Sequence, residues 1–151
     1  MSKSQLKPQI ESIIAKPLLE PKQKMQAICD LLQEQIDTYD WVGFYMANHD
    51  ERVLNLWCQA GEQTDHVQIP FGKGICGQVA VSNENFVVED VKAQDNYIAC
   101  SIHVKSEVVI PLFKDGKNIG QIDIDSNTID AFDKSDEEFL EWVNAQVAAI
   151  L

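Results

Sequence analysis

The sequence has little positive charge. Lys and Arg number 12 against 24 Asp and Glu, the net charge at pH 7 is −12, and Arg52 is the single arginine. A nucleic-acid partner or an anionic membrane surface selects a basic stripe, so neither partner is expected. Apolar runs are short, and the longest, such as 108–113, fall far below the ~20 residues of a membrane span. No leader of signal-peptide type is seen, so we expect a soluble, cytoplasmic protein.

Closely spaced metal or nucleotide motifs are also missing. The sequence has four cysteines, none of which forms a Cys-x-x-Cys pair with another: Cys29, Cys58, Cys76 and Cys100. Without a secretion signal they should be reduced at rest, and neither a zinc ribbon nor a thioredoxin motif is expected. His103 follows Cys100 at Cys-x-x-His spacing and His66 could join them, but structural zinc sites have a second close ligand pair. We therefore expect no metal site. The glycine loop at 72–74 also lacks the spacing of a P-loop, so we expect no nucleotide or other cofactor.

The 151 residues, 45% of them hydrophobic, suffice for one domain with a core. Apolar residues at helical spacing predict helices within 1–37 and over 135–151, the latter opened by a capping box that starts at Ser135. Alternating runs separated by turn residues predict strands and a short helix over 41–126. We therefore expect a single α+β domain over 1–151, an antiparallel sheet with N- and C-terminal helices packed on one side.

Two cysteines lie where a thiol could be activated. Cys76 follows the glycine loop 69–74 near the start of a predicted helix, whose dipole, with Lys73, would lower the thiol pKa. Cys76 could equally be a small apolar core residue. Cys100 ends Asn96-Tyr97-Ile98-Ala99-Cys100 beside cationic side chains that would stabilise a thiolate, but it could be an ordinary loop cysteine.

Three carboxylates gather on predicted strands. Asp123 and Asp125 alternate with isoleucines, so both point to one face of the strand, which is either solvated or lines a pocket. Paired carboxylates can bind an ammonium group, or one can stay protonated as a general acid. Glu107 would join them if the hairpin at 114–117 had a three-residue loop with Gly116 as a bulge, which sets Glu107 opposite Asp125. A two-residue turn would instead place Glu107 in the core, which is unfavourable for a charge.

Aromatic side chains on the first predicted strand are further candidates. Trp41 and Tyr45 alternate with Val42 and Phe44, so they could line a pocket wall. The pattern alone is equally compatible with surface or core aromatics.

Together these segments resemble the free methionine-R-sulfoxide reductases, a family of single GAF-domain enzymes. The matching stretches run in order from Trp41 to about Phe132, and they are Trp41-Val42-Gly43-Phe44-Tyr45, Ile69-Pro70-Phe71-Gly72-Lys73-Gly74-Ile75-Cys76-Gly77, Tyr97-Ile98-Ala99-Cys100, Ser106-Glu107-Val108-Val109-Ile110-Pro111-Leu112 and Ile119-Gly120-Gln121-Ile122-Asp123-Ile124-Asp125-Ser126. Two cysteines, Glu107 and the aspartate pair occurring together are more specific than a GAF domain alone.

The resemblance implies a thiol-dependent reduction of free L-methionine-(R)-S-oxide. Cys100 would be the nucleophile and would become a sulfenic acid. The acidic cluster of Glu107, Asp123 and Asp125 would bind the substrate ammonium and protonate the departing oxygen, while Trp41 and Tyr45 would enclose the methyl end. A second thiol would then form a disulfide with Cys100, which thioredoxin or another dithiol would reduce. The terminal helices could also bury a homodimer interface.

Two departures from the family pattern concern the later steps. His66 stands where many members have a resolving cysteine, and Ser101 stands where an aspartate often follows the nucleophile. Resolution would fall to Cys76, to Cys58 or to an external thiol. The alternatives to an enzyme are a stand-alone GAF sensor of a small ligand or of redox state, and a structural scaffold, which would leave the clustered carboxylates unexplained.

Overall fold

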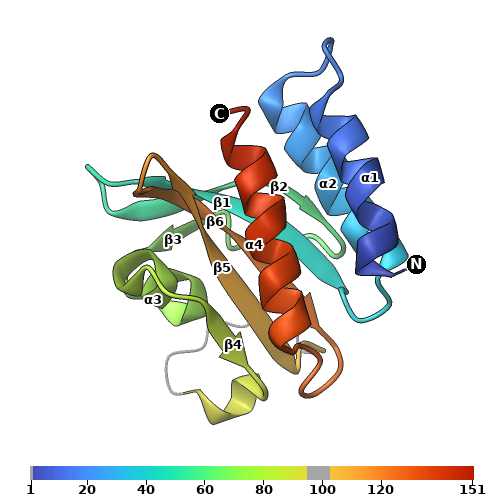
Figure 1. Cartoon of the computed structure of the whole chain (residues 1–151). Coiled ribbons are helices and arrows are strands. Elements are labelled where there is room, and N and C mark those ends of the chain that lie inside the picture. Colours follow the sequence, from blue (N-terminus) through green and yellow to red (C-terminus); the bar gives the residue numbers. More distant parts are fainter. Residues whose placement is uncertain (1, 95–102) are drawn as a thin grey trace.

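A six-stranded sheet forms the centre of the molecule in our computed structural model, which describes residues 2–94 and 103–151 (Figure 1). Its spatial order is β3-β2-β1-β6-β5-β4, and the neighbouring strands are antiparallel. The strands are β1 (Trp41–Asn48), β2 (Val53–Ala60), β3 (Gln68–Pro70), β4 (Phe86–Val88), β5 (Ser106–Lys114) and β6 (Lys117–Ser126). The long strands β1, β6 and β5 lie next to one another, so they form the base of any site on either face.

Helices from both ends of the chain cover one face of the sheet. These are α1 (Lys3–Ile14), α2 (Pro21–Gln35) and α4 (Lys134–Ala148). Their apolar residues pack with the inward-facing residues of the strands, and Leu140 of α4 shares one core with Phe44 of β1 and Ile122 of β6. Because side chains alternate along a strand, the residues between them face the other way. The predicted α+β fold with terminal helices on one side is confirmed.

The opposite face carries a second, smaller apolar cluster. The helix α3 (Gly74–Ser82) packs there against β5 and β6, and its Val79 joins Tyr45 and Val109. A 3₁₀ turn, η1 (Val91–Ala93), follows β4. The strand β4 therefore ends at Val88, and at the other edge of the sheet the short strand β3 pairs with β2.

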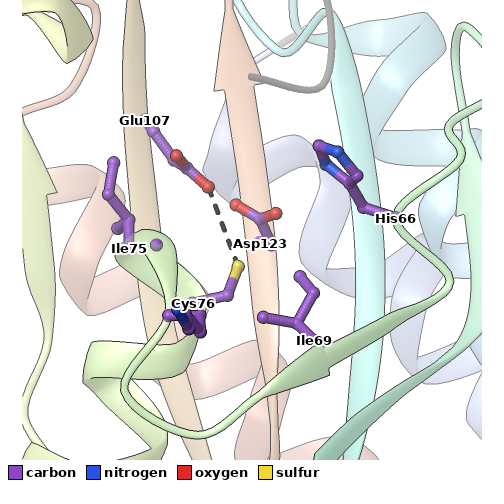
Figure 2. A pocket seen from close by; sticks show the side chains of 8 residues that line it. His66, Ile69, Ile75, Cys76, Glu107 and Asp123 are labelled. Carbon is purple, nitrogen blue, oxygen red and sulfur yellow. Dashed lines mark hydrogen bonds between the residues drawn. The ribbon is translucent and has the colours of Figure 1, made fainter. Parts of the chain in front are cut away.

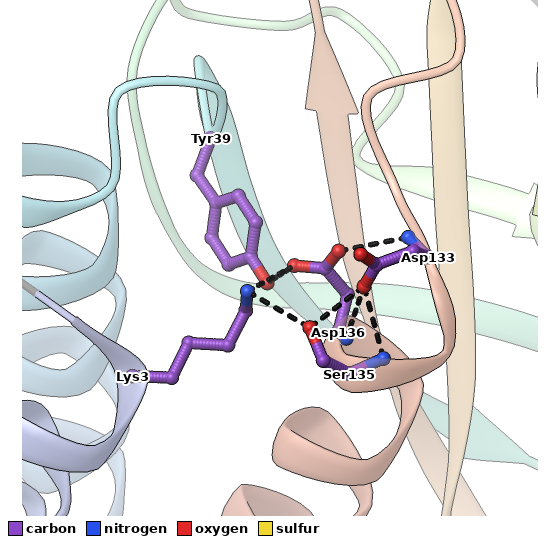
Figure 3. Close-up of polar contacts among 5 residues, drawn as sticks. All are labelled: Lys3, Tyr39, Asp133, Ser135 and Asp136. Atoms are coloured by element: carbon purple, nitrogen blue, oxygen red, sulfur yellow. Dashed lines mark hydrogen bonds and ion pairs between the residues drawn. The ribbon is translucent and has the colours of Figure 1, made fainter.

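The start of α4 differs from the predicted one. Asp133, rather than Ser135, is the N-cap, because its side chain accepts hydrogen bonds from the backbone N–H groups of Ser135 and Asp136 at 2.9 and 3.3 Å. The Asp136 carboxylate in turn accepts a hydrogen bond from the backbone N–H of Asp133 at 2.9 Å, which completes the capping box (Figure 3). The same carboxylate accepts from the Tyr39 hydroxyl at 2.6 Å and pairs with Lys3 at 3.3 Å. One capping residue thus joins α4 to α1 and to the segment before β1.

The β5–β6 hairpin confirms the predicted register but by a different route. Glu107 lies opposite Asp125, as expected. The turn, however, has two residues, Asp115 and Gly116, both with positive φ (52° and 77°). The register shifts instead between Leu112 and Phe113, which pair with Gly120 and Asn118 and leave Ile119 as the extra residue. The bulge that sets the three carboxylates on one face therefore lies in β6, away from the turn.

Within the described part of the chain, none of the helices combines the length and the apolar character required to cross a bilayer.

Candidate active site

Three elements bring a thiol and two carboxylates together on the sheet face that α3 covers. Cys76 comes from the first turn of α3, Glu107 from β5 and Asp123 from β6 (Figure 2). Their ligand atoms all lie within 4.8 Å of one another, and the Cys76 Sγ lies 3.8 Å from Oε2 of Glu107. Residues far apart in the sequence therefore form one buried polar cluster.

The strand register places this cluster on a single face. Asp125 lies opposite Glu107 in β5 and opposite Trp41 in β1, while Asp123 lies opposite Gly43. Residues directly opposite in an antiparallel pair share a face of the sheet. The predicted acidic residues and Trp41 consequently occupy the same side, and they are buried there rather than forming a solvated strand end.

Burial dominates the electrostatics of the cluster. Glu107, Asp123 and Asp125 are 4%, 1% and 1% exposed. Loss of hydration raises the pKa of the Asp123 carboxyl above its usual value. Among the described residues, neither Asp123 oxygen makes a hydrogen bond of good geometry. A protonated Asp123 or a bound cation would relieve this cost.

The environment of Cys76 does not activate its thiol at rest. Burial raises the pKa of Cys76 well above its usual value, and the neighbouring Asp123, Glu107 and Asp125 charges act in the same direction. This corrects the expectation that the start of α3 and Lys73 lower that pKa, since Lys73 is exposed whereas the carboxylates are in contact with the thiol. Cys76 is a neutral thiol at the resting site.

A narrow cavity opens beside the cluster. It is lined by His66, Ile69, Lys73, Gly74, Ile75, Cys76, Glu107 and Asp123. The space in it that is open to a water-sized group is about 10 Å³, which is about the space that one water molecule needs. Apolar and polar walls thus meet at the thiol and the carboxylates.

The two aromatic residues of β1 stand on the same face, outside the described wall of this cavity. Their ring centroids are 6.3 Å apart. The Trp41 Nε1 donates to Gln59 Oε1 at 2.7 Å, and the Tyr45 hydroxyl donates to the His66 backbone oxygen at 2.8 Å. The Trp41 ring lies over Gly43, where a Cβ atom would come within 2.3 Å of it. The polar atoms of both rings are therefore engaged, and the rings form a fixed apolar wall.

The remaining cysteines separate by face. Cys58 on β2 packs into the terminal-helix core, and its Sγ lies 3.9 Å from that of Cys29 on α2. Cys76 belongs to the other apolar cluster, so the sheet stands between Cys58 and Cys76. Cys100, the predicted nucleophile, lies outside the described residues, as do Tyr97 and Ser101.

Gln121 is a site-face residue that the sequence analysis missed. It is fully buried, and within the described part of the chain both of its side-chain polar atoms are without a hydrogen bond. It precedes Asp123 by two residues, so the same period-two alternation would have placed it on this face. His66, noted from the sequence as a possible partner of Cys100 and His103 and as a departure from a family pattern, lines the cavity itself.

Comparison with known proteins agrees with this architecture. Residues 19–151 match the GAF domain family. The free methionine-R-sulfoxide reductase of Escherichia coli (strain K12) is 36% identical over 121 residues, which cover 80% of this chain and 72% of the relative.

Two solved structures share the fold over most of its length. The type II free methionine-R-sulfoxide reductase from Thermoplasma acidophilum superposes with a TM-score of 0.82 at 40% identity, covering 86% of this chain and 91% of that one. The free methionine-R-sulfoxide reductase from Neisseria meningitidis, solved in complex with its substrate, gives 0.91 at 34% identity, with coverages of 98% and 87%. The chain therefore belongs to the free methionine-R-sulfoxide reductase family of GAF-domain proteins.

Proposed function

We propose that this protein reduces free L-methionine-(R)-S-oxide to L-methionine with thiol electrons. The observation that carries the proposal is the buried cluster of Cys76, Glu107 and Asp123 beside a cavity. A free amino acid brings an ammonium group that buried carboxylates can hold, and a sulfoxide that a thiol can reduce. Family membership and the reductase names of the relatives support the same substrate.

The first step transfers the sulfoxide oxygen to a cysteine. The Cys100 thiolate attacks the sulfoxide sulfur, the S–O bond breaks, and the products are methionine and a sulfenic acid on Cys100. The methionine sulfur gains the two electrons that the cysteine sulfur loses. The role of Cys100 rests on the family resemblance, because this residue lies outside the described part of the structure.

A proton must reach the sulfoxide oxygen as the S–O bond weakens. Asp123 suits this role, since burial raises its pKa and keeps a proton available at a higher pH than an ordinary aspartate would. Glu107 and Asp125 then remain to hold the ammonium group. Trp41 and Tyr45 would enclose the methyl end, where an apolar wall with no free polar atoms is appropriate.

Resolution of the sulfenic acid falls to Cys76 in this scheme. Its thiol sulfur attacks the Cys100 sulfur, water leaves, and a disulfide forms that thioredoxin or another dithiol reduces. We assign this role to Cys76 rather than Cys58 because Cys58 packs in the terminal-helix core, whereas Cys76 contacts the carboxylate cluster. A neutral, buried Cys76 thiol is protected from oxidation until the sulfenic acid forms.

The expectations of a single domain over 1–151, a possible homodimer and a cytoplasmic location accompany this proposal. The match to the GAF family over residues 19–151 supports the first of these.

The test is methionine release from racemic free methionine sulfoxide with excess dithiothreitol. We expect release to stop when about half of the substrate is consumed, since one sulfur epimer reacts. Cys100→Ser should abolish release while circular dichroism shows intact folding. No release from folded native protein would reject the reductase and favour a GAF sensor that binds a small ligand.

A further inference from the structure

The buried cluster has the donor atoms and the spacing of a transition-metal site. The Cys76 Sγ, a Glu107 oxygen and an Asp123 oxygen lie within 4.8 Å of one another, with 3.8 Å between Sγ and Oε2. Thiolate and carboxylate ligands bind zinc at about 2.3 and 2.0 Å, which at a tetrahedral angle separates them by about 3.5 Å. Only small side-chain movements are needed to bring these donors onto one ion.

A second observation, the state of Asp123, also indicates a missing cation. Asp123 is 1% exposed, and both of its oxygens are without a hydrogen bond of good geometry among the described residues. Figure 2 shows the Asp123 carboxylate beside Glu107 and above the Cys76 sulfur. A dication bound at Asp123 would take the place of the proton that otherwise neutralises this buried carboxylate.

We propose that Cys76, Glu107 and Asp123 form a binding site for Zn²⁺ or a similar borderline-soft dication. The thiol selects zinc or cobalt over Mg²⁺ and Ca²⁺, which prefer oxygen ligands alone. On binding, the Cys76 S–H bond breaks, the sulfur forms the bond to the metal, and the proton passes to solvent. The fourth position faces the cavity that His66 lines, where water completes the coordination.

The sequence alone predicts no such site because its ligands lie 16 to 47 residues apart along the chain. Structural zinc sites usually have pairs of ligands that are close together in the sequence. Here each ligand comes from a different element, and the three elements meet on one face of the sheet. The site has only three protein ligands and an open position, so we expect binding that is reversible by a chelator.

Metal binding would have a consequence for catalysis that rests on the proposed function. The ion would occupy Glu107, which is to hold the substrate ammonium, and Asp123, which is to protonate the sulfoxide oxygen. It would also occupy the Cys76 thiol, which is to resolve the sulfenic acid. Zn²⁺ should therefore inhibit methionine release, with relief by EDTA and by excess free methionine sulfoxide. The ion is an inhibitor in this scheme, and the metal-free protein is the active form.

Cobalt absorption tests the site without recourse to activity. Reduced native protein titrated with Co²⁺ should develop a thiolate-to-cobalt charge-transfer band in the near ultraviolet that saturates at one equivalent. Zn²⁺ should displace the cobalt and abolish the band. Isothermal titration with Zn²⁺ in buffers of different ionisation enthalpy should show proton release.

Two variants assign the ligands. Cys76→Ser should lose the band and at least tenfold in Zn²⁺ affinity, and Asp123→Asn should lose at least tenfold in affinity while retaining the band at high Co²⁺. The matched control is Cys58→Ser, a buried thiol on the other side of the sheet, which should bind like the native protein.

Either of two results would overturn the site: no band in folded native protein, or a band that persists in Cys76→Ser. Because these readouts do not use the substrate, an inactive protein that still binds cobalt through Cys76 would reject the reductase and keep the metal site.

Discussion

Asp123 is the residue on which the chemistry of the pocket most depends. Its pKa is raised by burial, so the carboxyl is protonated below that pKa and ionised above it. An acid catalyst works only in its protonated form. The reductase rate should consequently fall as the pH rises through the Asp123 pKa.

We predict that Asp123→Asn lowers kcat by about 10²- to 10⁴-fold, the usual contribution of a general acid. The substitution should also remove the decrease of kcat with rising pH, because an amide does not titrate in this range. The measurement is the pH profile of kcat for native protein, Asp123→Asn and Glu107→Gln. If the fall persists in Asp123→Asn and disappears in Glu107→Gln, Glu107 is the donor and our assignment is wrong.

Gly43 illustrates how a residue without a side chain shapes the site. A Cβ atom there would lie 2.3 Å from the Trp41 ring, so the ring must move when alanine replaces the glycine. We predict a loss of kcat/KM for free methionine sulfoxide of about tenfold to a hundredfold, the effect of a small misplacement of a substrate-positioning group.

The matched control for Gly43 uses Trp41→Leu, which removes the indole. In that background, Gly43→Ala should change kcat/KM little further, because the clash is gone. An equal loss in both backgrounds would mean that Gly43 acts through the β1–β6 pairing rather than through Trp41.

At the scale of elements, α4 is joined to the rest of the fold by its capping box. The Tyr39 hydroxyl donates to Asp136 at 2.6 Å, and burial together with the Asp136 charge raises the Tyr39 pKa, so the phenol stays a donor (Figure 3). Because Tyr39 is only 1% exposed, water cannot take the place of its hydroxyl as the hydrogen-bond donor to Asp136.

We predict that Tyr39→Phe lowers the free energy of unfolding by about 1.5–3 kcal/mol, as for hydrogen bonds to charged groups. Lys3→Met, which removes the partly exposed ion pair with Asp136, should cost less than about 1 kcal/mol. Urea denaturation of the two variants measures both. Equal stability of Tyr39→Phe and native protein would show that the contact contributes nothing net.

The same elements show what local sequence patterns can predict. Helical spacing and alternation placed the terminal helices and the long strands, because those patterns report directly on burial. The predicted N-cap of α4, Ser135, is two residues after the observed one, Asp133. Both residues have side chains that can cap a helix, and only the structure shows which of them accepts hydrogen bonds from the first backbone N–H groups. The Glu107–Asp125 register was predicted from the cost of burying a charge, whereas the bulge that produces it, at Ile119, has no local signal.

At the scale of the whole molecule, the sheet separates two functions, one on each face. The terminal-helix face holds a purely structural core that includes Cys29 and Cys58, and the α3 face holds Cys76 with the carboxylates. The candidate site residues could be named from the sequence, because the resemblance to a family aligned them. Their convergence, the raised pKa of Cys76 and the location of His66 on the cavity depend on how distant segments pack.

This separation predicts different behaviour of two buried thiols. Cys76→Ser should release one equivalent of methionine and then stop when thioredoxin is the reductant, because the sulfenic acid has no resolver. Cys58→Ser should continue to turn over like native protein. Methionine per chain, counted by chromatography, distinguishes them, and a stall in Cys58→Ser alone would reject the two-face account.

The most direct measurement compares kcat/KM for free methionine-(R)-sulfoxide with that for its N-acetyl derivative, which lacks the ammonium charge. If the buried carboxylates hold that group, the free amino acid should be preferred by at least a hundredfold, the scale of losing a charged hydrogen-bonded contact of about 3 kcal/mol. Equal rates for the two substrates would contradict the account, because the acidic cluster would then have no part in recognising the substrate.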